Sequence, residues 1–221
     1  MSNVTDFEIR GVVVSRDHVD GKTVVFDLGG VLIDWNPRYL YRRLFREDEA
    51  AMERFLGEVC TPEWNREQDA GRSCAEAIAM KMGQYPQHRD MIAAFYGRWE
   101  EMLGGVMEDS LRVLGEVRRE GVALYVVTNW SRETFPIARS RYEFLSWFDG
   151  IVVSGEEGVA KPDAALYRVL FERYGIIPES AFFVDDSLEN VETAERLGMT
   201  AHRFTTAENL RERLRAFGAL P

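Results

Sequence analysis

The feature that most constrains this chain of 221 residues is a mainly apolar run that ends in a carboxylate and two glycines. The run Lys22–Phe26 is followed by Asp27, Leu28 and Gly29–Gly30. Its character predicts a buried strand, and the glycines let the backbone close around whatever the carboxylate contacts. Ligands of an open parallel sheet collect at the carboxyl ends of strands, so Asp27 is the first candidate for a reacting group. Taken alone, it is equally a helix cap or a turn residue.

Three further strand-like segments also end in polar side chains. These segments and their ends are Val122–Val127 before Thr128–Asn129, Ile151–Ser154 before a glycine-rich loop and Lys161–Pro162, and Ala181–Val184 before Asp185–Asp186. Turn chemistry explains any one of these ends but not all four at once. The set therefore indicates a shared site at one edge of a parallel sheet.

After residue 105, helix-like and strand-like patterns alternate to the end of the chain. The segments not yet named are Ser110–Arg119, Arg132–Leu145, Ala164–Tyr174, Leu188–Leu197 and Ala207–Phe217 as helices, and Thr200–Phe204 as a strand. Such alternation predicts an α/β fold, a Rossmann-like parallel sheet covered by helices on both faces. At the start of the chain, Phe7–Val14 is either an added edge strand or a tail.

Between the first strand and the alternating region, the pattern changes from strands to helices. Asn36–Pro37 predicts a helix start, and Ser73 with Glu76 three residues later predicts another through a capping box. We therefore expect a core of residues 1–34 and 106–221 and an inserted all-α cap at 35–105. The expected cap has four or five helices and hinges near Asp34–Trp35 and Gly104–Gly105.

Composition limits the partners. The formal net charge of -10 at pH 7 disfavours nucleic acid or an anionic membrane surface as a partner, because both attract clustered positive charge. No stretch is apolar enough to span a bilayer, and the N-terminus lacks the pattern of a secretion signal, so we expect a cytoplasmic protein. Cys60 and Cys74 are expected to be small buried apolar residues. Either a monomer or a homodimer is compatible with the sequence.

Together the four motifs resemble those of the haloacid dehalogenase-like (HAD) hydrolase superfamily, in its phosphatase-like branch with a helical cap inserted after the first core strand. The similar segments are Phe26–Leu32, Val127–Asn129, Lys161–Asp163 and Phe183–Asp186. The resemblance implies a Mg²⁺-dependent phosphatase of small anionic phosphorylated metabolites, such as sugar phosphates. It would act through an aspartyl-phosphate on Asp27.

A carboxylate that attacks a phosphate monoester needs a cation, because both groups are negative. Asp185 and Asp186 are placed to hold it with Asp27, and hard oxygen ligands favour Mg²⁺. The family pattern adds the backbone carbonyl of Gly29 and favours Asp186 as a direct ligand, with Asp185 binding directly or through water. The alternative for the aspartate pair is a cap on the helix that begins near Leu188.

Two further motifs are expected to bind the phosphoryl group. Thr128 offers a hydroxyl, and the backbone N–H groups of Asn129 and Trp130 are expected to cradle phosphoryl oxygens. Lys161 is expected to pair with Asp27 and with the transferring group. The alternatives are a helix cap for Thr128 and a solvated surface position for Lys161.

The expected cap contains candidate residues for recognising the leaving group of the substrate. These are Trp64, Glu67, Asp69 and Arg72, with Trp35 at the entrance to the site. Ordinary packing and solvated faces explain the same residues equally well.

Gly29 departs from the phosphatase pattern, which commonly has a second aspartate there as the general acid and base. Asp34, Glu67 and Asp69 are possible substitutes, although the hinge explains Asp34 better.

Three other functions remain open. One is a 2-haloacid dehalogenase that forms an aspartyl ester on Asp27 without metal, although the carboxylates of Asp185 and Asp186 argue against it. Another is a phosphate-binding regulatory protein with weak or no turnover, which the loss of an acid at Gly29 suggests. The last is phosphoryl transfer to a sugar hydroxyl, which would need the same missing acid.

Overall fold

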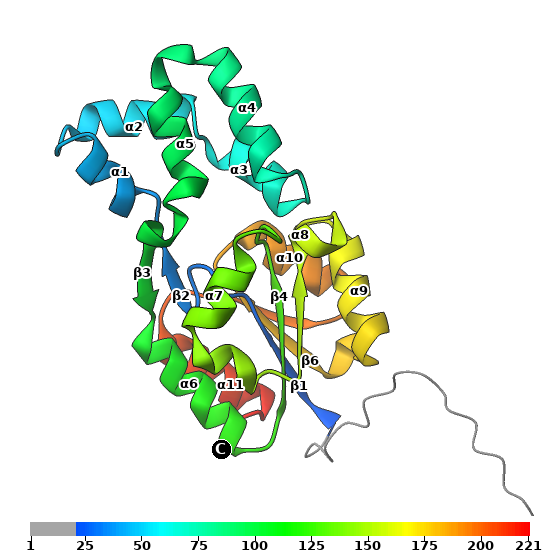
Figure 1. Cartoon of the computed structure of the whole chain (residues 1–221). Coiled ribbons are helices and arrows are strands. Elements are labelled where there is room, and N and C mark those ends of the chain that lie inside the picture. The colour runs from blue at the N-terminus through cyan, green and yellow to red at the C-terminus, as the bar shows by residue number, and fades with distance from the viewer. Residues whose placement is uncertain (1–20) are drawn as a thin grey trace, which may run out of the picture.

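The computed structural model describes residues 21–221, so the segment expected as an edge strand or tail at residues 7–14 lies outside the described part. A parallel sheet in the order β5-β4-β1-β6-β7 forms its centre (Figure 1). The strands are β1 (Thr23–Phe26), β4 (Ala123–Thr128), β5 (Gly150–Val153), β6 (Ala181–Asp185) and β7 (Thr200–Arg203). This confirms the predicted Rossmann-like α/β fold.

Helices cover both faces of this sheet. The helices are α6 (Glu108–Arg119), α7 (Phe135–Arg141), α8 (Ser154–Glu157), α9 (Ala164–Tyr174), α10 (Leu188–Arg196) and α11 (Ala207–Phe217). Alternate residues of β1 point to opposite faces. Val24 and Phe26 belong to one apolar core with residues of α6, α7 and α11, whereas Val25 belongs to another with residues of α9 and α10. Burial on both faces explains why the strands read as continuous apolar runs.

Most elements after residue 105 begin and end within two residues of the predicted bounds, and α9 and α11 match them. The segment predicted as one helix over 132–145 is different. It contains α7 and a separate 3₁₀ helix, η4 (Glu143–Trp147). The helix begins late because Ser131–Thr134 forms a turn, and Pro136 fits the first helical turn, where its missing N–H costs nothing.

Residues 38–102, here called the helical insertion, lie beyond the carboxyl end of β1 (Figure 1). Their elements are α1 (Arg38–Leu44), α2 (Glu49–Glu58), α3 (Pro62–Asp69), α4 (Cys74–Gln84), η2 (Pro86–His88), α5 (Arg89–Gly97) and η3 (Trp99–Met102). Two antiparallel strands, β2 (Ile33–Trp35) and β3 (Leu103–Val106), connect the insertion to the sheet. The residues expected as hinges therefore form a short ribbon. Gly104 lies against Asp34, where a Cβ would overlap the carboxylate.

Both predicted helix starts in the insertion have local hydrogen bonds that account for them. The Asn36 Oδ1 accepts a 3.0 Å hydrogen bond from the Arg38 N–H at the start of α1. The Ser73 Oγ accepts a 3.2 Å hydrogen bond from the Glu76 N–H at the start of α4. These bonds satisfy backbone donors that the first turn leaves without a helical partner.

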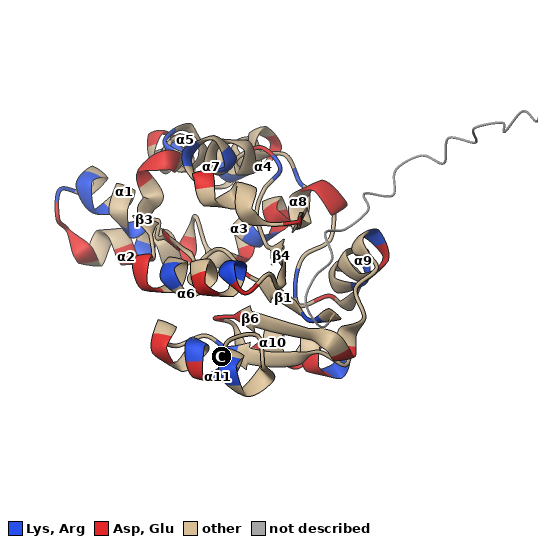
Figure 2. Cartoon of the chain, turned by 90° about the horizontal axis from the view of Figure 1, so that it is seen from below, with Lys and Arg blue, Asp and Glu red and all other residues tan. Residues whose placement is uncertain are grey.

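Charged residues of both signs are interspersed along outer helices such as α6, whereas the central strands carry few (Figure 2). Cys60 and Cys74 are buried and free, as expected. Among residues 21–221, every helix falls short of the length and hydropathy that crossing a membrane requires.

Candidate active site

The carboxyl ends of β1 and β6 bring two aspartates side by side. Phe26 lies opposite Val184 in the parallel register, so the next residues along the two strands are Asp27 and Asp185. The Asp27 N–H donates to the Val184 carbonyl at 2.9 Å. Asp27 is buried, and its Oδ1 accepts a 2.7 Å hydrogen bond from the Leu28 N–H. Sheet register therefore fixes the spacing of the two carboxylates.

Lys161 lies between these carboxylates. Its Nζ is 2.9 Å from Asp27 Oδ1 and 2.6 Å from Asp185 Oδ2, and it donates to the Val127 carbonyl at 2.8 Å. The Lys161 side chain is fully buried, so it is not a solvated surface lysine. Burial opposes its charge, but Asp185 and Asp27 outweigh burial and raise the pKa of Lys161. The amine therefore stays protonated.

Asn129 holds Lys161 in place through its backbone. The Asn129 Nδ2 donates to the Lys161 carbonyl at 3.0 Å, and the Lys161 N–H donates to Asn129 Oδ1 at 2.8 Å. The Trp130 N–H, expected to cradle a phosphoryl oxygen, instead donates to Ser154 Oγ at 2.9 Å. That expectation was wrong, because the turn after β4 uses this donor to hold the start of α8.

The segment between β5 and Lys161, which the sequence indicates as a glycine-rich loop, is in large part helical. It contains α8, and Gly155 packs so tightly that a Cβ would lie 2.7 Å from the Trp130 carbonyl oxygen. Gly71 of the insertion also approaches it, since a Cβ there would lie 3.2 Å from the Gly158 Cα. Close packing rather than flexibility places Lys161.

Asp185 has protein partners on both carboxylate oxygens. In addition to Lys161, Asp185 accepts hydrogen bonds from the Ser187 N–H at 2.9 Å and from Asn190 Nδ2 at 3.0 Å. It thereby fixes the turn that leads into α10. Asp186 is exposed and lines the cavity that contains Asp27. Of the two, Asp186 is therefore the more accessible to a ligand.

The three aspartates fit a hard divalent cation. Asp27, Asp185 and Asp186 each offer one carboxylate oxygen, and these oxygens lie within 4.8 Å of one another. Three carboxylates face the single ammonium group of Lys161, so a further cation would balance their charge. Oxygen donors of this kind suit Mg²⁺. Gly29 lines the same cavity.

Gly30, rather than Gly29, allows the close approach of Asp186. Gly30 has a φ of 73°, and a Cβ there would overlap the Asp186 carboxylate, lying 2.9 Å from its Cγ. At Gly29, an added Cβ would meet nothing within 4 Å. The position where the phosphatase pattern has an aspartate is therefore open space.

The surroundings of Asp27 act on its protonation in opposite directions. Burial raises the pKa of Asp27 to about 7, with Lys161 opposing the shift and Asp185 and Asp186 adding to it. A cation beside Asp27 favours its ionised form, which a nucleophile needs.

The Thr128 hydroxyl is buried at the end of β4. Its Oγ1 has no hydrogen-bond partner within residues 21–221 and therefore makes no helix-capping bond there. A buried hydroxyl without a partner fits a ligand oxygen that would bind to it.

Two adjoining cavities occupy the space between the sheet and the helical insertion. The first, the carboxylate cavity, contains Asp27, Lys161 and Asp186 together with Arg66 of α3. The second is here called the indole cavity. It is lined by Gly29, Trp35, Asn65, Asp69, Tyr96, Trp99, Asn129, Trp130, Ser131 and Thr134. Trp35 lines both cavities, which agrees with its expected place at the entrance.

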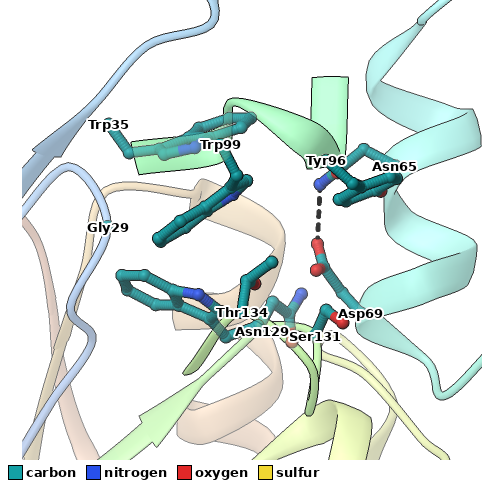
Figure 3. A pocket seen from close by; sticks show the side chains of 10 residues that line it. Gly29, Trp35, Asn65, Asp69, Tyr96, Trp99, Asn129, Ser131 and Thr134 are labelled. Atoms are coloured by element: carbon teal, nitrogen blue, oxygen red, sulfur yellow. Dashed lines mark hydrogen bonds between the residues drawn. The ribbon is translucent and has the colours of Figure 1, made fainter. Parts of the chain in front are cut away.

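Helical periodicity decides which residues of α3 reach these cavities. Trp64 and Gln68, four residues apart, are buried in the insertion, where the Trp64 ring packs 5.1 Å from that of Phe95. Asn65 and Asp69, one position further along, line the indole cavity (Figure 3). The expectation that Trp64 reads the leaving group was wrong, because its face of the helix points into the insertion.

Arg72 is also turned away from the cavities. Its Nε donates to Gln68 Oε1 at 2.7 Å, and its guanidinium pairs with Glu67. Arg66, which sequence reasoning missed, is the arginine of this helix that lines the carboxylate cavity. Arg66 lies three residues before Asp69, on the same helix face, and this spacing could have identified it as a cavity residue.

Among the three candidate substitutes for the missing acid, only Asp69 lines a cavity at the site. Asp34 accepts a 2.5 Å hydrogen bond from the Tyr39 hydroxyl in the ribbon, and Glu67 is exposed beside Arg72. Asp69 Oδ2 accepts a 3.0 Å hydrogen bond from Asn65 Nδ2.

The pKa of Asp69 suits a group that exchanges protons near neutral pH. Burial raises this pKa to about 7, with a hydrogen bond from the Ser131 backbone and the charge of Arg66 opposing the shift. Asp27 adds to the increase.

Comparisons with known proteins agree with this geometry. A family described as haloacid dehalogenase-like hydrolase matches residues 22–198. The sesquiterpene phosphatase astK of Aspergillus oryzae is 29% identical, over 83% of this chain and 90% of its own. The phosphorylated carbohydrates phosphatase of Thermotoga maritima is 25% identical, over 80% and 82%.

A solved structure of a HAD family enzyme from Bacteroides thetaiotaomicron, in complex with magnesium and inorganic phosphate, shares the fold. Its TM-score is 0.63 at 22% identity, over 83% of this chain and 94% of that one. The family match covers the strands β1, β4, β5 and β6, the helical insertion and all four motifs. The chain therefore belongs to the haloacid dehalogenase-like hydrolases.

Proposed function

We propose that this hydrolase is a Mg²⁺-dependent phosphatase of small phosphorylated metabolites. The observation that carries the proposal is the convergence of three carboxylates and one buried lysine at a single edge of the sheet. The names of the fungal and bacterial relatives, both phosphatases, support it. The magnesium and phosphate bound by the Bacteroides enzyme also support it.

Asp27, Asp186 and the Gly29 carbonyl would hold Mg²⁺, with Asp185 as a further ligand. When bound, the ion neutralises negative charge that would otherwise keep a carboxylate and a phosphate monoester apart. Lys161 adds a fixed positive charge beside Asp27. A preorganised positive environment of this kind stabilises the charge of the transition state more than that of the ground state.

The phosphoryl group would be bound from several sides. Thr128 offers its hydroxyl to a phosphoryl oxygen, and Lys161 and Arg66 offer positive charge. The Asn129 backbone N–H would donate to a phosphoryl oxygen, whereas its side-chain amide is already hydrogen bonded to the Lys161 backbone and fixes that lysine.

In the first step, a carboxylate oxygen of Asp27 would attack phosphorus while the bond to the leaving oxygen breaks. Asp69 would donate its proton to that leaving oxygen, so the product is a neutral alcohol. In the second step, water would attack the aspartyl-phosphate and give a proton to Asp69. Inorganic phosphate leaves, and Asp27 and Asp69 return to their starting states.

The helical insertion would serve as a cap, with residues 35–105 forming the cap and residues 1–34 and 106–221 the core. The support for this division is that α3 extends Arg66 and Asp69 to the two cavities. The β2–β3 ribbon is the connection about which the cap would move.

The test is hydrolysis of p-nitrophenyl phosphate by protein treated with a chelator and then with Mg²⁺. We expect Mg²⁺ to restore activity, and we expect Asp27→Asn to abolish it. The leaving group is acidic, so the assay depends little on a general acid. A flat response to Mg²⁺ would contradict the proposal.

Two further results distinguish the other functions. Halide release from 2-chloropropionate in the presence of a chelator would identify a dehalogenase. Equal rates for wild type and Asp27→Asn on a broad set of phosphate esters would identify a binding protein without turnover on Asp27.

A further inference from the structure

The indole cavity differs in character from the carboxylate cavity that it adjoins. It contains about 430 Å³ of space, its open mouth included. Figure 3 shows the indole rings of Trp35 and Trp99 along one wall, across from Asn65, Tyr96 and Asp69. Gly29 lines both cavities, so a molecule in the indole cavity lies next to the carboxylate cavity, which contains Asp27.

The polar side chains of the indole cavity are largely occupied with one another. The Tyr96 hydroxyl donates to Asn65 Oδ1 at 2.9 Å, and Asn65 Nδ2 donates to Asp69 Oδ2 at 3.0 Å. Both ends of the Asn129 amide bind the Lys161 backbone. Few side-chain acceptors therefore remain for a ligand.

Three tryptophans, Trp35, Trp99 and Trp130, lie beside Gly29, Ser131 and Thr134 in the rest of the lining. The rings of Trp99 and Trp130 lie 5.5 Å apart, and both residues are at least nine-tenths buried. The indole Nε1 atoms of Trp35 and Trp130 are buried and have no partner in the described part of the chain. The free polar groups of this wall are thus N–H donors.

A polyhydroxyl leaving group would find indole N–H donors in this lining but few acceptors for its own O–H groups. Each sugar hydroxyl taken from water needs hydrogen-bond partners, and an unpaired one is costly to bury. An apolar group instead gains free energy for the area that it buries against the indole rings.

Resting on the proposed phosphatase function, we propose that the indole cavity binds an apolar leaving group. The preferred substrate class is then the monophosphate esters of small apolar aliphatic alcohols rather than sugar phosphates. The enclosed part of this cavity, about 80 Å³, is smaller than small-molecule sites in general, which span about 300–1,000 Å³. This size suits a short chain and not a long lipid. The only oxygen of such a leaving group is the ester oxygen, which Asp69 would protonate.

The test is a series of ethyl, butyl and hexyl phosphates measured with Mg²⁺ beside glycerol 3-phosphate and glucose 6-phosphate. We expect kcat/KM to rise with chain length, up to about fourfold for each methylene fully buried. Trp35→Ala should reduce that dependence on chain length. Trp147→Ala is the matched control, because Trp147 is also a partly buried tryptophan but packs on Phe144 and Arg118, outside the cavity.

A flat series, or higher kcat/KM for the polyol phosphates, would overturn the inference while Asp27-dependent turnover left the phosphatase function standing. If no ester is hydrolysed, the phosphatase function fails, and binding of hexylphosphonate and methylphosphonate still tests the cavity. Tighter binding of the hexyl compound, with quenching of tryptophan fluorescence, would support the apolar site. Equal binding would contradict it.

Discussion

At the scale of single residues, we propose that Asp69 takes the role of an acid that position 29 lacks. Gly29 leaves open space where related phosphatases have a carboxylate, and Asp69 reaches the same region from α3. The sequence identified Asp69 as one of three possible substitutes. Choosing among them required the helix face and the burial of each, which only the folded chain supplies.

Asp69→Asn should lower kcat for alkyl phosphates by about 10²-fold or more, in the range typical of a lost general acid. An acid must be protonated to donate, so the wild-type rate should fall as pH rises through the Asp69 pKa of about 7. The variant should lose this dependence. A matched control is Glu67→Gln, which neutralises an exposed carboxylate of the same helix. An unchanged pH profile in Asp69→Asn would contradict the assignment.

Gly29→Asp should raise kcat more for substrates with poor leaving groups than for substrates with good ones. The added side chain meets nothing within 4 Å of its Cβ and would restore a second proton donor. When Gly29→Asp is added to Asp69→Asn, we expect kcat to recover roughly tenfold or more on hexyl phosphate and to change little on p-nitrophenyl phosphate. The measurement is a leaving-group series. Equal gains for both substrates would show that the carboxylate acts otherwise.

At the scale of elements, parallel register accounts for the part of the site that could be predicted. The carboxyl ends of β1, β4 and β6 are adjacent, so strand-end residues such as Asp27, Thr128 and Asp185 necessarily lie together. The contributions of the insertion were harder to predict. A shift of one position along α3 turns a side chain from the cavity toward the insertion, as Trp64 and Asn65 illustrate.

The hydrogen bond that caps the start of α3 should contribute to the stability of the protein. The Thr61 Oγ1 accepts a 3.2 Å hydrogen bond from the Trp64 N–H, which caps the helix that carries Asp69. Thr61→Ala should lower the free energy of unfolding by about 1 kcal/mol, as measured by urea denaturation. Thr61→Ser keeps the hydroxyl, so the free energy of unfolding should fall much less. Equal losses in both variants would mean that the methyl packing, not the cap, is responsible.

At the scale of the whole molecule, the sheet and the helical insertion contribute different chemistry. In the proposed reaction, the sheet edge supplies the carboxylates and lysine for attack on phosphorus, and the insertion supplies Tyr96, Trp99 and Asp69 for the leaving group. The α/β architecture followed from the alternation of segments. The aromatic cavity did not, because its residues come from β2, α3, α5, η3 and the turn after β4, which no local pattern connects.

The proposed reaction requires that Asp27 becomes phosphorylated during turnover. The most direct measurement is rapid quenching of the Mg²⁺-loaded protein during p-nitrophenyl phosphate hydrolysis, followed by mass spectrometry of the peptide that contains Asp27. We predict that this peptide carries one phosphoryl group, that chelation removes the signal, and that Asp27→Asn abolishes it. Turnover without any phosphoryl group on Asp27 under these conditions would contradict the account.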